Sequence, residues 1–168
     1  MRATWIVIGS LLFALWAKTS FFYYIPLLSP NLYLLFVVLF IIRWKGPEVY
    51  YIAAIFGIMA DVYSTMSFGV YGFSFFLMSF PLRWYAIKMF QGSVFSLPIL
   101  VGFLGLVLKL IIFVVGIGAS QEVGLKVGWI REMLLFEILP TALLAPYAYT
   151  ALVILEKMGN IRLHERKF

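Results

Sequence analysis

The stretch GIMADVYSTMSFGVYG, residues 57–72, places an acidic residue, Asp61, inside strongly apolar sequence. An ionised carboxylate in an apolar environment is costly and is normally given a partner or a function. Ala54, Gly57, Asp61 and Ser64 follow helical spacing along one face. Small residues on such a face favour close contact with a neighbouring helix. We therefore expect Asp61 to face protein, in a packing motif formed by Gly57, Asp61, Ser64, Gly69 and Gly72.

The composition explains why this stretch is so apolar. The chain has 168 residues, of which 64% are hydrophobic and only 12% are charged. Long apolar runs recur from end to end, which predicts an all-α polytopic membrane protein with one domain over 1–168. The first run is interpreted as a retained span. A cleaved signal peptide is the alternative, but Lys18–Phe21 is a poor cleavage site.

About 20 apolar residues cross a bilayer, and fewer suffice when a helix is buried among others. On this basis the chain has six predicted spans. The third and fourth are short and are joined tightly at 64–67, which is typical of a helical hairpin. Pro140 and Pro146 lie inside the sixth span and should kink it. The six spans cover about 3–25, 27–42, 47–64, 66–82, 94–118 and 132–155.

The basic residues predict the orientation. With the N-terminus inside, nine lysines and arginines fall in cytoplasmic regions and three (Lys18, Lys126 and Arg131) in outer loops, while Lys109 lies within a span. The positive-inside rule then places both termini in the cytoplasm. The basic inner face favours anionic lipids as partners. Nucleic acid is not expected, because the basic residues are scattered over short loops.

Two acids and two lysines share the outer half of the predicted bundle. Lys109 is expected to pair with Asp61 or with Glu137, because the helix face of Lys109 also carries several glycines that favour helix contact. The candidate intramembrane polar cluster is therefore Asp61, Lys109 and Glu137. Lys18 is expected to extend to the outer interface and contribute little, and the same behaviour is the alternative for Glu137.

Catalytic chemistry is not indicated. Cysteine is absent, which excludes disulfides and thiolate metal sites. The only histidine, His164, lies in the charged tail. The sequence contains no HExxH motif and no strand-linked glycine-rich phosphate loop. We expect no enzyme activity, no cofactor and no metal.

The opening stretch also carries a family resemblance. Its Gly-x-x-x-Asp, followed by a Ser/Thr-containing turn and Phe-Gly, resembles the signature of the bacterial rod shape-determining protein MreD family. The length, the Pro30–Leu32 start of the second span, the span number and the short basic tail are also similar. The specific part of the resemblance covers Gly57–Gly72, and the remainder is hydropathy.

The resemblance implies a non-enzymatic scaffold subunit of the elongasome in the cytoplasmic (inner) membrane of a bacterium. Such a subunit supports cell shape and side-wall peptidoglycan synthesis. Such a subunit is expected to bind MreC, a bitopic protein with a large periplasmic domain. MreC would connect it to RodA, a penicillin-binding transpeptidase and MreB. The family's fold also resembles the S-components of energy-coupling-factor vitamin transporters. A subunit that binds a small, vitamin-like molecule is therefore the alternative function.

Overall fold

The structure, a computed structural model, describes residues 2–21, 30–44, 46–64, 68–88, 96–118 and 134–158. Within these ranges it contains six α-helices and no strand, which confirms the predicted all-α class. Two of the helices continue through single π-helical turns, η1 and η2. The elements are α1 (Arg2–Trp16), η1 (Ala17–Phe21), α2 (Leu32–Arg43), α3 (Glu48–Val62), α4 (Val70–Lys88), α5 (Ser96–Gly118), η2 (Leu134–Ile138) and α7 (Leu139–Met158).

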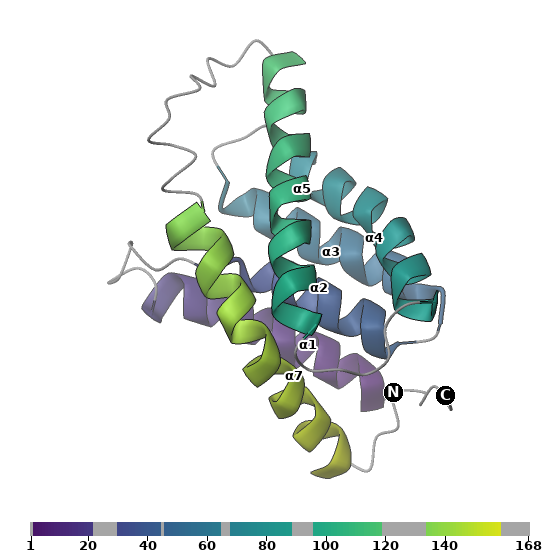
Figure 1. Cartoon of the computed structure of the whole chain (residues 1–168). Helices are drawn as coiled ribbons and strands as arrows, with labels where there is room; N and C mark the ends of the chain where they lie inside the picture. The colour runs from purple at the N-terminus through teal and green to yellow at the C-terminus, as the bar shows by residue number, and fades with distance from the viewer. Residues whose placement is uncertain are drawn as a thin grey trace.

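Helix α2 lies at the centre of the bundle. It is apolar on every side, and ten of its twelve residues are buried, the pattern of a helix surrounded by protein. It contacts α1, α3, α4, α5 and α7, and it lies behind α5 in Figure 1. Its first turn is capped by Asn31, whose side chain accepts a hydrogen bond from the Leu34 amide at 3.1 Å.

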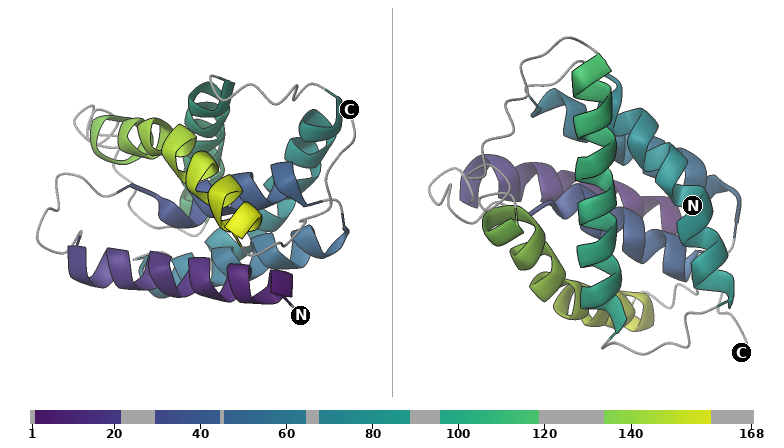
Figure 2. Two further views of the ribbon diagram at one scale, coloured as in Figure 1. Left: turned by 90° about the horizontal axis from the view of Figure 1, so that it is seen from below. Right: turned by 45° about the horizontal axis from the view of Figure 1, so that its top comes forward.

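Helices α3 and α4 form the predicted hairpin, and they share the most extensive helix contact in the described chain. They run side by side in both views of Figure 2. The chain turns at Gly69, whose φ of +98° lies in the region that glycine tolerates best. Further along the pair, the rings of Tyr50 and Phe80 stack with centroids 4.6 Å apart.

Helix α5 lies between α4 and α7 in Figure 1 and packs against both. Small residues allow the α5–α7 contact: a side chain on Gly102 would first meet Ala142, at 3.8 Å. Gly105 faces Ile138 and Leu34 in the same way. Close approach through small residues is the usual packing of membrane helices.

The two π turns each carry one charged residue, Lys18 in η1 and Glu137 in η2. Turns of this kind are rare and occur frequently at functional sites. In η2 the irregularity has a local reason, because Pro140, the second residue of α7, has no amide hydrogen to donate to the preceding turn. Helix α7 continues through the second proline, Pro146.

Every described α-helix except α2 carries large apolar side chains on the outer surface of the bundle. Two helices, over Ser96–Val114 and Leu135–Lys157, are long and apolar enough to cross a membrane by length and composition. Shorter apolar helices cover Trp5–Ser20 and Leu32–Arg43. Large side chains that are more than half exposed include Trp5, Tyr51, Phe73, Phe103 and Tyr147, from α1, α3, α4, α5 and α7 respectively.

Candidate functional site

The carboxylate of Asp61 caps the start of α4. Asp61 is only 4% exposed. One of its oxygens accepts a hydrogen bond from the Tyr71 amide at 2.9 Å, and the other accepts one from the Gly72 amide at 3.0 Å. The first amides of a helix have no partner within the helix and attract negative charge. The buried charge of Asp61 is therefore stabilised by backbone donors.

The glycines of the motif bring the two backbones of the hairpin together. A Cβ on Gly57 would lie 2.6 Å from both the Gly72 Cα and the Tyr71 carbonyl oxygen, a distance that real Cβ atoms do not adopt. Ser64 contributes locally, since its hydroxyl donates to the Asp61 carbonyl at 3.1 Å. The motif residues are thus the parts of one turn, in which Gly69 reverses the chain.

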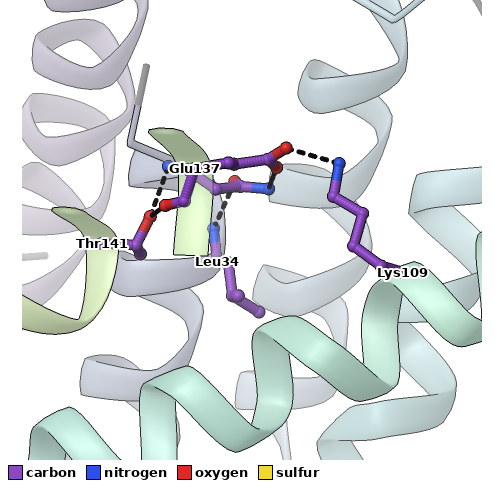
Figure 3. A network of polar contacts seen from close by, with 5 residues as sticks. Leu34, Lys109, Glu137 and Thr141 are labelled. Carbon is purple, nitrogen blue, oxygen red and sulfur yellow. Dashed lines mark hydrogen bonds and ion pairs between the residues drawn. The ribbon is translucent and has the colours of Figure 1, made fainter. Parts of the chain in front are cut away.

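Lys109 on α5 pairs with Glu137 on η2, at 2.5 Å between Nζ and Oε2. Figure 3 shows the glutamate extending toward the lysine from the neighbouring helix. Of the two partners predicted for Lys109, the structure therefore brings Glu137 to it, and it places Asp61 on the α4 amides instead. Glu137 also does not extend away to an interface, because its other oxygen accepts a hydrogen bond from the Asn31 side-chain amide at 3.2 Å.

Asn31 and Thr141 complete this cluster, and the sequence analysis assigned neither of them to it. The Thr141 hydroxyl donates to the backbone carbonyl of Glu137 and accepts a hydrogen bond from the backbone amide of Asn31 at 2.8 Å. Figure 3 shows the contact between Thr141 and Glu137. An asparagine before an apolar run is a helix-start signal that could have identified Asn31. Thr141 has no comparable signal, because a threonine inside an apolar helix commonly bonds its own preceding turn.

Tyr71 connects the hairpin to the ion pair. Its backbone amide donates to the Asp61 carboxylate, and its side chain interacts electrostatically with Lys109. Polar contacts therefore run continuously from Asp61 through Tyr71, Lys109 and Glu137 to Asn31, joining α3, α4, α5, η2 and the start of α2. Next to the ion pair lies a recess of about 10 Å³, room for about one water molecule.

Lys18 lies beside this cluster without joining it. Its ammonium group is 5.8 Å from the centroid of the Tyr33 ring, and it interacts electrostatically with Glu137 and Lys109. The side chain is half-buried. The structure thus directs the Lys18 side chain toward α2, whereas the sequence analysis favoured a side chain extended to the outer interface.

A second group of polar contacts lies at the opposite end of α2, about 18 Å from Asn31 for twelve residues of helix. Arg43 forms an ion pair with the buried Glu156 of α7. Arg83 of α4 donates to the carbonyl oxygens of Trp44, at 3.3 Å, and Gly46, at 2.9 Å. The sequence analysis missed Glu156, which lies just beyond the predicted end of the sixth span.

The described residues bring no three His, Cys, Asp or Glu side chains together in a way that could hold a metal ion. His164 lies outside the described residues. No protein-family model matches the chain, and comparisons with curated proteins and with solved structures find no match. The geometry of the two polar groups and of the hairpin therefore carries the functional argument.

Proposed function

We propose that the chain is a non-enzymatic, multi-pass scaffold subunit of the bacterial elongasome, of the MreD kind. The observation that carries this proposal is the hairpin joint of α3 and α4. Gly57, Asp61 and Gly69, the motif positions of the sequence resemblance, all serve this one joint. Gly57 lies in backbone contact with Gly72, the Asp61 carboxylate accepts from two helix amides, and Gly69 turns the chain. A motif that holds two helices together is consistent with a subunit whose function is helix–helix association.

The proposal includes six membrane spans with both termini in the cytoplasm. The apolar exterior of α1, α3, α4, α5 and α7 supports it, because such surfaces are stable against lipid and are a liability in water. The described helices overlap the six expected stretches, and two of them, over Ser96–Val114 and Leu135–Lys157, are long and apolar enough to cross a membrane. Arg43 and Arg83 then lie at the inner end, where a basic face attracts anionic lipids, and the cluster around Glu137 lies in the outer half.

The expected partner is an MreC-like bitopic protein, through which the chain would connect to RodA, a penicillin-binding transpeptidase and MreB. Scaffolding requires a rigid bundle with free lateral faces. The polar contacts join the helices internally, while the lateral faces of α1, α4, α5 and α7 carry exposed apolar side chains. A transmembrane helix of a partner can pack against such a face by van der Waals contact.

Co-expression with the MreC-like protein of the same bacterium tests the proposal. The tagged chain, extracted in mild detergent, is expected to co-elute with that protein in size-exclusion chromatography. A Gly102→Ala variant, whose new methyl group meets only Ala142 at ordinary contact distance, should co-elute equally. Removal of the chain from rod-shaped cells that depend on it should make the cells round. Failure to co-elute, with both proteins inserted and monodisperse, would reject the proposal.

Mass spectrometry of the same preparation examines the vitamin-binding alternative. Pockets for such ligands measure roughly 300–1,000 Å³, whereas the recess beside Lys109 has about 10 Å³. A stoichiometric vitamin-like molecule in the purified protein would replace the scaffold proposal with the transporter alternative.

A further inference from the structure

The described polar cluster around Glu137, together with Lys18 beside it, has more positively charged than negatively charged side chains. Lys18 and Lys109 both interact with Glu137, but only Lys109 forms an ion pair with it. Among the described residues no carboxylate lies within ion-pair distance of Lys18. Asp61, the other acid of the predicted polar cluster, accepts hydrogen bonds from two backbone amides. Among the residues that the structure describes, two ammonium groups therefore share one carboxylate, which leaves one positive charge in excess.

Tyr33 adds a second unsatisfied group next to Lys18. Its ring lies below the ammonium, its side chain is completely buried, and its hydroxyl has no hydrogen-bond partner in the part of the chain that is described. Buried hydroxyl groups are normally hydrogen-bonded, because leaving one unpaired costs stability. Within the described ranges, a cation without an ion-pair partner and a hydroxyl without a hydrogen-bond partner thus lie on neighbouring side chains of η1 and α2.

We propose that Lys18 and Tyr33 form a binding site for a phosphate group at the outer end of the bundle. A phosphate carries negative charge and several acceptor oxygens. A single phosphate group can therefore form an ion pair with the Lys18 ammonium and accept a hydrogen bond from the Tyr33 hydroxyl. Charge-assisted hydrogen bonds of this kind are the stronger class. Lys109 raises the local positive potential but remains committed to Glu137. The phosphate can come from a lipid headgroup or from free phosphate.

The site is tested by thermal unfolding of the detergent-purified full chain, followed by the fluorescence of its five tryptophans. Dioleoylphosphatidylglycerol is compared with dioleoylglycerol, which has the same acyl chains without the phosphate. Sodium phosphate is compared with sodium chloride at equal ionic strength. At a hundred times the Kd, a phosphate probe should raise the melting temperature by about 5 °C.

Four variants locate the effect. Lys18→Met should lose nearly all of the shift, while Lys18→Arg should keep it because the charge remains. Lys157→Met removes an exposed lysine at the other end of α7 and should keep the whole shift. Tyr33→Phe should melt no lower than wild type without ligand, since it removes an unpaired hydroxyl, and should show a smaller shift with ligand.

A shift with the phospholipid alone identifies a headgroup, and a shift with sodium phosphate identifies free phosphate; both support the site. The proposal is overturned if neither probe shifts the wild type or if dioleoylglycerol acts as strongly as the phospholipid. It is also overturned if Lys18→Met retains the full shift. None of these readouts depends on a partner protein, so the scaffold proposal stands or fails separately.

Discussion

Gly57 and Gly72 meet backbone to backbone, with no room between them for a single carbon atom. A Cβ on Gly57 would lie 2.6 Å from the Gly72 Cα, whereas one on Gly72 would lie 3.0 Å from the side chain of Ile58. This asymmetry shows where the hairpin tolerates change. At Gly57 the obstacle is backbone, which cannot move without separating the helices; at Gly72 the nearest obstacle is a side chain that can rotate.

Gly57→Ala should therefore destabilise the chain before any partner is considered. Inserting an atom into a tightly packed contact typically costs about 1–3 kcal/mol, enough to lower the melting temperature by several degrees in detergent. Gly102→Ala is the matched control, since its Cβ would stand 3.8 Å from Ala142. Equal melting temperatures for the two variants would show that the hairpin contact does not limit stability.

Asp61→Asn should weaken the same hairpin for an electrostatic reason. An asparagine keeps one acceptor oxygen, but its NH₂ group would face the amide that now donates to the second carboxylate oxygen. Leaving a buried donor unpaired costs about 1–3 kcal/mol. Ser64→Ala, which removes only a bond to the preceding turn, should cost less in the same melting experiment. A Ser64→Ala loss as large as that of Asp61→Asn would contradict the capping role.

The sequence predicted the helices and the hairpin well because both follow from apolar run length and from a short connection. The spacing of Gly57 and Asp61 also placed them on one face of a helix. The hydrogen-bond partners of Asp61 could not be predicted from the sequence, for a physical reason. Its partners are the backbone amides of Tyr71 and Gly72, and every residue except proline has such an amide, so no side-chain pattern identifies them.

The ion pairs show a different limit. Asp61 and Glu137 were both predicted to lie in the outer half of the bundle, so their depth could not select the partner of Lys109. The choice depends on how each helix is rotated about its axis. Arg43 and Glu156 lie 113 residues apart, and only the packing of α7 on α2 brings them together. Asn31 could have been found as a helix cap, but its bond to Glu137 depends on the η2 turn.

Reporter fusions test the proposed topology. Fusions after residue 168 and within 89–92 should report the cytoplasm, and a fusion within 119–130 should report the outside, because the basic residues are concentrated in the inner regions. Alkaline phosphatase and a fluorescent protein, fused at each position, give opposite signals and control for expression. A cytoplasmic signal from 119–130 would remove the six-span arrangement and move the Glu137 cluster out of the outer half.

Replacing Lys109 should show which acidic residue forms an ion pair with it. Lys109→Met leaves the Glu137 carboxylate without its cation, and breaking a buried pair typically costs about 3–5 kcal/mol. Adding Glu137→Gln should recover part of this loss, because the amide can still accept from Asn31 while the unpaired charge is gone. Adding Asp61→Asn to Lys109→Met should recover nothing, since Asp61 is held by amides rather than by Lys109. The melting temperatures of the three single and two double variants decide the matter, and rescue by Asp61→Asn instead of Glu137→Gln would show that the lysine pairs with Asp61.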